Sequence, residues 1–572
     1  MKRIVYILSV CAISLSSCSE LDLNPLSTGS NANWYEDESE VVMSLNDLYR
    51  EAFWPKDSES YSDNFQSRSN TNEITNGTIN SESSMVETRW KNAYKAIGRV
   101  NSLLANIDKA AKSIPEASLS KYIAEAKFIR ASQYADLISH FGDVVYTEGV
   151  PDLAIASALS RTPKATVLKH IYADYDSAAM FLPTSYGSTE TQRATKGAAY
   201  AMKARIALYM GDYAVARDAA QNCMDLKVYQ LYPDFAKLFA LTTKNSVESI
   251  FVIPRSVEFG SCLGKGGSPY LDNAGDWMTR NPGCYAGNNP SWELFCSFLC
   301  TDGLPIDESP LFNPREPFKN RDPRCTATIV EFQTRHLGYM YQPHPDSLKC
   351  YNFNTGKYVT NNDSRGVNQY ASYDGIMFKK GIDDSWLTSG NKVDPDKIIV
   401  RYADVLLMYA EAKIELKEID QTVLDAINKV RARAYGVTYT QTSAYPSVTT
   451  TDQTALRKIL RTERRVELAN EGLRYMDLIR WRLAEKALTK PSYGMLDPAD
   501  LRTKIIKTGL WFFPEVPSID EDGLPDFTSM YNKGLIKLLA IRSFDANKEY
   551  LWPIPSKDIL INPNMTQNPG GY

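Results

Sequence analysis

Residues that commonly catalyse reactions are few in this sequence and poorly spaced for catalysis. Four histidines are present, at positions 140, 170, 336 and 344, and they form neither an HExxH motif nor a zinc-ligand spacing. Residues 260–264, Gly-Ser-Cys-Leu-Gly, have the spacing of a nucleophile elbow, but the surrounding Gly, Lys and Ser favour a flexible loop. A glycosidase would use two positioned carboxylates, which leave no spacing signature among 68 acidic residues. We therefore predict a binding protein without a cofactor, and a glycosidase is the enzymatic alternative.

Aromatic and short polar side chains in predicted loops are better candidates for function. The apolar faces of sugar rings stack on aromatic rings, and sugar hydroxyls bond to planar polar groups, so a sugar site combines both types. We predict that six such side chains converge on one ligand-binding surface: Trp54, Asp63, Asn64, Tyr270, Trp277 and Tyr285. Aromatic residues make up 11% of the chain, however, and most of them must belong to a large core.

Composition excludes one class of partner and constrains the cysteines. The net charge of -4 argues against a nucleic-acid partner, which requires a basic face. Of the nine cysteines, two lie at the amino terminus, and the remaining odd number excludes a complete disulfide framework. Cys296 and Cys300 share one face of a predicted helix. Because no histidine or cysteine pair lies near them in sequence, we predict a buried thiol pair and no metal site.

The amino terminus predicts export and lipid attachment. Residues 1–3 carry two positive charges and residues 4–15 form an apolar run, the pattern of a signal peptide that is too short to span a bilayer permanently. The run ends in Leu-Ser-Ser-Cys at residues 15–18, which resembles the lipobox of bacterial lipoproteins. We expect residues 1–17 to be removed as a lipoprotein signal peptide and Cys18 to be acylated, which anchors a protein to a membrane. An ordinary secretory signal is the alternative.

Helical periodicity flanks a long irregular middle region. Apolar residues recur three or four apart in segments 41–53, 90–107, 124–141, 167–182, 196–210, 213–226, 401–416, 422–435 and 454–470. The sequence Gly211-x-Tyr213-x2-Ala216, between two of these segments, resembles a tetratricopeptide-type hairpin. Between residues 249 and 395 this periodicity is lost while Gly, Pro, Asn and Tyr accumulate, which is typical of functional loops. We predict an all-α fold with helical parts at 18–248 and 396–572 and a loop-rich ligand-binding region with short strands at 249–395.

Five groups of motifs are spread along the chain in a distinctive order. They are residues 124–131 with 141–144, residues 302–306 with 320–324, residues 401–412, residues 463–481 and residues 550–570. The first begins Ala-Glu-Ala-Lys-Phe-Ile-Arg-Ala, and the third reads Arg-Tyr-Ala-Asp-Val-Leu-Leu-Met-Tyr-Ala-Glu-Ala. Together these motifs resemble the SusD/RagB family of outer-membrane nutrient-binding lipoproteins.

This resemblance implies a single all-α domain of tetratricopeptide-like hairpins whose long loops carry the ligand site. It also implies a protein that faces the cell exterior, captures an oligosaccharide and acts as the lid of a SusC-like TonB-dependent transporter in the outer membrane. Peptide capture, as in RagB-like members, is the alternative ligand class, and a scaffold or adhesin built on the helical repeats is a third function. We predict an ion-pair network between packed helices, and not catalysis, for Arg464, Arg465, Glu467, Arg474 and Asp477.

Overall fold

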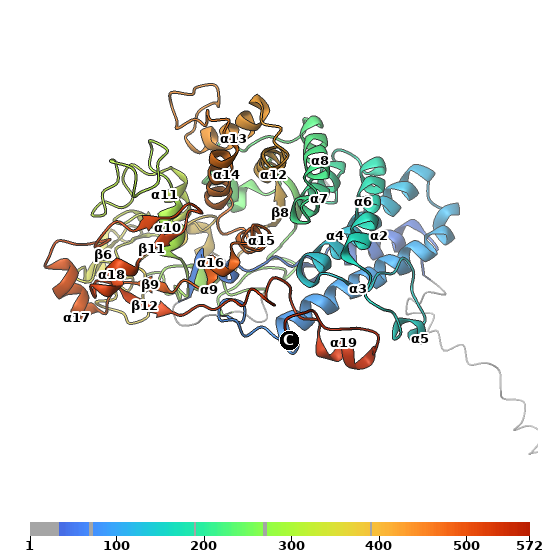
Figure 1. Cartoon of the computed structure of the whole chain (residues 1–572), viewed down its shortest axis with the longest axis horizontal. Coiled ribbons are helices and arrows are strands. Elements are labelled where there is room, and N and C mark those ends of the chain that lie inside the picture. The colour runs from blue at the N-terminus through green and yellow to red at the C-terminus, as the bar shows by residue number, and fades with distance from the viewer. Residues whose placement is uncertain are drawn as a thin grey trace, which may run out of the picture.

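Helices dominate the computed structural model, which describes residues 34–67, 72–187, 190, 192–266, 271–388, 390 and 392–572 (Figure 1). The first group of helices comprises α2 (Glu38–Asp47), α3 (Ser84–Asn106), α4 (Glu116–Phe141), α5 (Leu153–Ala156), α6 (Lys164–Phe181), α7 (Lys196–Tyr209) and α8 (Tyr213–Asp225). The second group comprises α12 (Tyr402–Glu415), α13 (Gln421–Ala434), α14 (Gln453–Glu467), α15 (Arg474–Arg480), α16 (Ala484–Leu488), α17 (Pro498–Asp500), α18 (Thr528–Asn532) and α19 (Ser556–Ile561). Helix makes up 42% and strand 10% of the structure, which confirms the predicted all-α class.

The helical hairpin of α7 and α8 shows how local sequence sets the packing. Alanines recur every third residue along α7 and are fully buried, so that neighbouring helices approach closely: Ala198, Ala201, Ala204 and Ala207. Gly211 reverses the chain with a φ of +77°, and the Asp212 side chain accepts a hydrogen bond from the Val215 backbone N–H at 3.4 Å as the N-cap of α8. The buried Ala216 then packs in the hairpin, as the tetratricopeptide-type pattern predicts.

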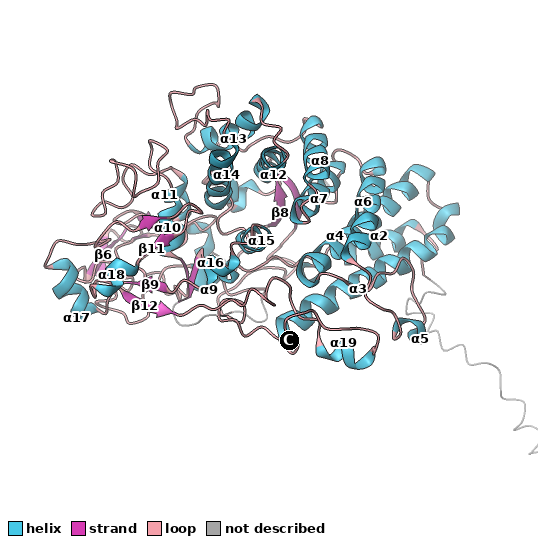
Figure 2. Cartoon of the chain, viewed as in Figure 1, coloured by secondary structure: helices cyan, strands magenta, loops and turns pink. Residues whose placement is uncertain are grey.

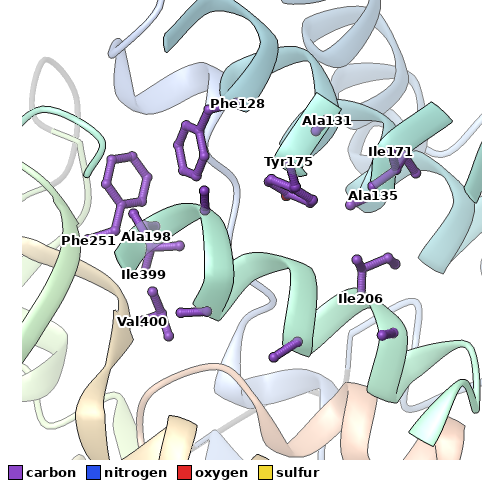
Figure 3. Close-up of a cluster of buried hydrophobic side chains, with 14 of the residues drawn as sticks. Phe128, Ala131, Ala135, Ile171, Tyr175, Ala198, Ile206, Phe251, Ile399 and Val400 are labelled. Atoms are coloured by element: carbon purple, nitrogen blue, oxygen red, sulfur yellow. The ribbon is translucent and has the colours of Figure 1, made fainter. Parts of the chain in front are cut away.

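A shared core joins the two helical groups (Figure 3). Side chains from α4 and α6 point toward α7 in this view, and residues of β2 (Ser249–Ile253) and β8 (Lys397–Arg401) close the cluster at one end. Among them, Phe128, Phe251 and Val400 are almost completely buried. Burying each such side chain stabilises the fold by about 1.5–3 kcal/mol. Because β2 pairs antiparallel with β8, the chain returns from the middle region directly onto the first group of helices.

The middle region contains short strands and short helices around a second core (Figure 2). Its helices are α9 (Ala274–Trp277), α10 (Trp292–Ser297) and α11 (Arg324–Thr328). The remaining strands are β1 (Phe65–Ser67), β3 (Asn288–Pro290), β4 (Arg335–His336), β5 (Tyr339–Met340), β6 (Lys349–Asn352), β7 (Lys357–Thr360), β9 (Ser492–Gly494), β10 (Ser518–Ile519), β11 (Pro525–Asp526) and β12 (Lys537–Ala540). Strands β4 to β7 form a four-stranded antiparallel sheet, and the other sheets have two strands. The predicted loop-rich region with short strands is therefore present.

A buried ion-pair network ties the two halves of the chain together. We define this network by the residues Glu248, Arg324, Arg401, Arg433, Glu467 and Glu471. Arg401 bonds to Glu248 and Glu467 at 2.6 Å each, and Arg324 lies 3.1 Å from Glu467. Burial alone would raise the pKa of the Glu467 carboxyl, but Arg433, Arg401 and Arg324 outweigh that effect and lower the pKa to about 2.

The motif residues of α14 and α15 also form buried ion pairs, as predicted. Arg464 lies 2.9 Å from Asp404 and 3.1 Å from Asp477, and all three side chains are almost fully buried. Arg474 pairs with Asp63 at 2.8 Å. These contacts join α12, α14 and α15, which confirms a scaffold role for this charge-rich stretch. Within the described part of the chain, no helix combines the length and apolar composition that crossing a membrane requires.

Candidate ligand groove

Trp277 is held at the surface between two buried elements. It is the last residue of α9, whose N-cap Asn273 accepts a hydrogen bond from the Gly275 N–H at 3.1 Å. The Trp277 ring packs edge-on against Phe65 of β1, with ring centroids 6.1 Å apart, and lies 5.6 Å from Phe378. The side chain remains partly exposed. Two rings therefore fix the orientation of a third ring that is open to a ligand.

Two hollows meet at Trp277 and at the neighbouring Asp272, and we call them together the Trp277 groove. The first has a volume of about 260 Å³, and the second about 320 Å³. Besides the shared pair, the first hollow is lined by polar and aromatic side chains that include Lys244, Arg255, Lys380, Trp386 and Asp396. The second is lined mainly by small neutral polar side chains, among them Ser58, Ser60, Ser67, Asn72, Thr75 and Asn288. A groove that combines an aromatic ring with many neutral hydrogen-bonding groups is suited to a polyhydroxylated ligand.

Pairing of β1 with β3 brings the two walls of the second hollow together. These strands are antiparallel, with Phe65 opposite Pro290 and Ser67 opposite Asn288. The polar loop after the first helix thereby reaches the Gly- and Asn-rich stretch of the middle region, more than two hundred residues later in the chain. This arrangement explains why segments that are distant in sequence contribute to one groove.

Each hollow contains a buried hydrogen-bond donor without a partner among the described residues. Trp386, in the 3₁₀ turn Asp384–Leu387, is 6% exposed, and its indole Nε1–H has no acceptor. Arg542 is 5% exposed; one guanidinium nitrogen donates to Glu293 at 2.7 Å, whereas Nη1 has no acceptor. Buried donors are almost always satisfied in folded proteins, so these two unpartnered donors, each on a residue that lines a hollow, are exceptions.

The predicted Tyr285 lies beside α9 but outside the two hollows. Its backbone N–H donates to the Gly275 carbonyl at 2.8 Å, and its ring packs directly over Gly275, where a Cβ atom would lie 2.8 Å from the ring. The Lys265 ammonium sits 5.7 Å from the ring centroid. Of the two predicted rings, only Trp277 lines the groove. Tyr270 and Cys18 lie outside the described residues.

Trp54, Asp63 and Asn64 are buried, which corrects their predicted position on an open surface. Trp54 is 4% exposed, donates from Nε1 to the Leu48 carbonyl at 2.9 Å and stacks on Phe128 with centroids 5.9 Å apart. The predicted first helix ends early, at Asp47, and the chain then turns inward, which carries this ring into the core.

Asp63 and Asn64 lie behind the wall of the second hollow and not in its lining. Arg474 and Arg465 bind the two Asp63 carboxylate oxygens at 2.8 and 2.9 Å, and these cations lower the pKa of the carboxyl despite its burial. Asn64 donates to Glu59 and accepts from Arg465, at 2.8 Å each. The residues of this polar loop that line the hollow are instead their neighbours Ser58, Ser60, Ser67 and Asn72.

Metal binding and disulfides receive no support from the described residues. They contain no cluster of three or more His, Cys, Asp or Glu side chains that could hold a metal ion. All seven cysteines in this part of the chain are buried free thiols, including Cys296 and Cys300. Burial raises the pKa of the Cys296 thiol, which therefore stays protonated.

The fold and the groove define a class of helical-repeat proteins that bind ligands with loops carried on the helical body. Comparison with known proteins identifies the family. The model of the SusD family matches residues 255–572, more than half of the chain, and the chain therefore belongs to the SusD family. A second family model, described as "Starch-binding associating with outer membrane", matches residues 35–208. The family is accordingly one of carbohydrate-binding proteins associated with the outer membrane, and its members are not described as enzymes.

Several relatives resemble the chain over nearly its whole length. SusD-like protein P2 of Formosa agariphila is 24% identical, with both chains covered completely. A crystal structure from Bacteroides fragilis, described as a SusD-like carbohydrate binding protein, is 28% identical with a TM-score of 0.74, covering 93% of this chain and 99% of that one. A laminarin binding SusD-like protein has the same fold, with a TM-score of 0.65 and 20% identity over 94% of this chain and 100% of that one.

Proposed function

We propose that this protein captures an oligosaccharide in the Trp277 groove and delivers it for uptake across the outer membrane. The observation that carries the proposal is the partly exposed Trp277 ring at the junction of two hollows, the second of which is lined mainly by neutral hydrogen-bonding groups. Family membership supports a carbohydrate ligand, because related proteins are described as carbohydrate-binding or laminarin-binding.

The groove geometry explains how such a ligand would be held. An apolar face of one sugar ring stacks on Trp277, which supplies affinity, while hydroxyls on its edge bond to serine and asparagine side chains in the second hollow. The unpartnered donors of Trp386 and Arg542 add a directed bond on each side. Because hydrogen-bonding groups recur on both sides of the ring, the ligand is longer than one sugar unit.

The second part of the proposal concerns the location of the protein and its partner. Cys18 carries a lipid anchor that holds the protein on the outer face of the outer membrane. The partner is a SusC-like TonB-dependent transporter, which this protein covers as a lid that opens to load the oligosaccharide. Outer-membrane association of the family supports this location.

A binding screen tests the ligand class directly. The purified protein and its Trp277→Ala variant are applied to an array of oligosaccharides and peptides, and the hits are quantified by calorimetry. We expect the wild type to bind oligosaccharides, and the variant to lose that binding while its melting curve stays cooperative. Binding to peptides alone would replace the proposal with peptide capture.

The anchor has a separate test. The Cys18→Ala variant should leave the membrane fraction and appear in a soluble fraction, because acylation needs the cysteine thiol. Incorporation of labelled fatty acid into the wild type but not into the variant provides the chemical control. A variant that stays in the membrane and still incorporates the label would contradict the lipid anchor.

A further inference from the structure

The cations that line the Trp277 groove are already neutralised by the protein. Arg255 binds Glu51 at 2.9 Å, and Lys380 binds Glu471 at 2.7 Å. Two further cations are also paired: Lys244 lies 3.2 Å from Asp394 and Arg542 lies 2.7 Å from Glu293. None of these four side chains therefore offers an unpaired positive charge to a ligand.

The carboxylate of Asp272 is different, because no cation lies within 4 Å of it among the described residues. Its side chain is exposed and accepts a hydrogen bond from the Asn273 backbone N–H at 2.7 Å. Asp272 lines both hollows beside Trp277. The groove thus presents a negative charge at the point where the two hollows meet, next to the aromatic ring.

We infer that the Trp277 groove selects uncharged glycans and rejects glycans that carry carboxylate or sulfate groups. This inference rests on the proposed function and names the substrate class of the same site. A hydroxyl of a neutral sugar stacked on Trp277 can donate to Asp272, and a hydrogen bond to a charged acceptor is stronger than a neutral one. An anionic group at that position meets a like charge instead.

The expected difference in affinity between neutral and anionic glycans follows from the exposure of Asp272. Two like charges about 4 Å apart in water repel enough to lower affinity by roughly three- to tenfold. Arg542 keeps one free N–H, but its charge, like that of each other lining cation, is paired with a carboxylate, so the lining cations compensate little. The repulsion is screened by salt, so the discrimination must shrink as ionic strength rises.

The test compares matched pairs of glycans on the same protein. Maltohexaose, cellohexaose and laminarihexaose are each used unmodified and with C6 oxidised to a carboxylate, in low and in high sodium chloride, and affinities are measured by calorimetry. We expect at least one unmodified hexaose to bind and its oxidised partner to bind three- to tenfold more weakly at low salt. This difference in affinity between the paired glycans should narrow at high salt. An oxidised form that binds as tightly as its parent, or more tightly, would overturn the inference and leave glycan capture intact. Absence of binding by every form would sink glycan capture and this inference with it.

The variant Asp272→Asn assigns the effect to one residue. It keeps the shape of the side chain and its acceptor for the Asn273 N–H but turns a charged hydrogen bond to the sugar into a neutral one. We therefore expect neutral glycans to bind about fivefold more weakly and the difference in affinity between paired glycans to disappear. As a control, Asp152→Asn makes the same charge change in the exposed loop before α5 and should leave the difference in affinity between paired glycans unchanged. Melting curves of both variants establish that they fold. A gap that persists in Asp272→Asn contradicts the assignment.

Discussion

The buried ion-pair network and the Trp277 groove are both rich in polar groups, but their bonding differs. In the network, Arg401 reaches Glu248, Glu467 and Glu471, and each charge has partners within the protein. In the groove, donors of Trp386 and Arg542 have no acceptor among the described residues, and the Asp272 carboxylate has no cation beside it. Charges that are paired within the protein stabilise a scaffold, whereas polar groups without an internal partner can recognise a ligand.

The largest effect is expected when a charge is removed from the network, which tests whether the network stabilises the fold. Glu467→Ala leaves Arg324, Arg401 and Arg433 without their shared partner, and breaking a buried ion pair costs about 3–5 kcal/mol. We expect a loss of this size in the free energy of unfolding, measured with denaturant. Lys557→Ala, which removes an exposed ion pair with Glu87, should change the stability little, because solvent and salt screen exposed pairs. A Glu467 variant as stable as that control would show that the network is not structural.

Acid should weaken the network. The pKa of Glu467 is lowered from 4.5 to about 2, so its contribution is complete above pH 4.5 and is lost as pH falls toward 2. The expected loss is about 3 kcal/mol for this carboxyl. The free energy of unfolding is measured between pH 5 and 2, a range set by that shift, and its slope against pH checks this prediction. In Glu467→Gln the slope should be shallower, and an unchanged slope would assign the acid sensitivity to other carboxyls.

The smallest expected effect concerns an unused donor of the groove. Trp386→Phe removes the indole N–H but keeps most of the buried ring, so stability should change little. If the N–H bonds to the ligand, its loss costs about 0.5–1.5 kcal/mol, or roughly two- to tenfold in affinity. Calorimetry with the oligosaccharide identified by the array measures this change. Trp292→Phe is the matched control, because that indole already donates to the Asp374 carbonyl at 2.8 Å in the core; it should affect stability and not binding.

The scaffold could be predicted well from the sequence because its signals are local. Helices α6, α7 and α8 were predicted to within three residues at each end, because apolar periodicity is a local property of each segment. Helices α3 and α4 were predicted to within one residue at their C-terminal ends, where Gly142 caps α4, but they begin six and eight residues before the predicted segments. The buried ion pairs of Arg464, Arg474 and Asp477 were predicted from the charge composition of α14 and α15. In both cases neighbouring residues carry the information.

The groove could be predicted only in part, because its walls meet through long-range contacts. Trp277 and Tyr285 were both chosen for their Gly- and Asn-rich surroundings, but only Trp277 lines the groove. Trp54 was misplaced, since nothing local shows that the chain turns inward after Asp47. Asp63 was chosen as a free carboxylate, but its partners Arg465 and Arg474 lie some four hundred residues away. Sequence spacing cannot reveal such a pair, and the same limit concealed the roles of Trp386 and Arg542.

The most direct test of the central claim compares Trp277→Ala with Trp54→Ala on the same oligosaccharide. Trp277 belongs to the groove, so its loss should weaken binding by about fivefold or more in calorimetry, while the protein still melts cooperatively. Trp54 belongs to the core, so its loss should lower the free energy of unfolding by about 3–5 kcal/mol, while the folded fraction binds like the wild type. Normal binding by Trp277→Ala, or a selective binding defect in folded Trp54→Ala, would contradict the assignment of the ligand site to the Trp277 groove.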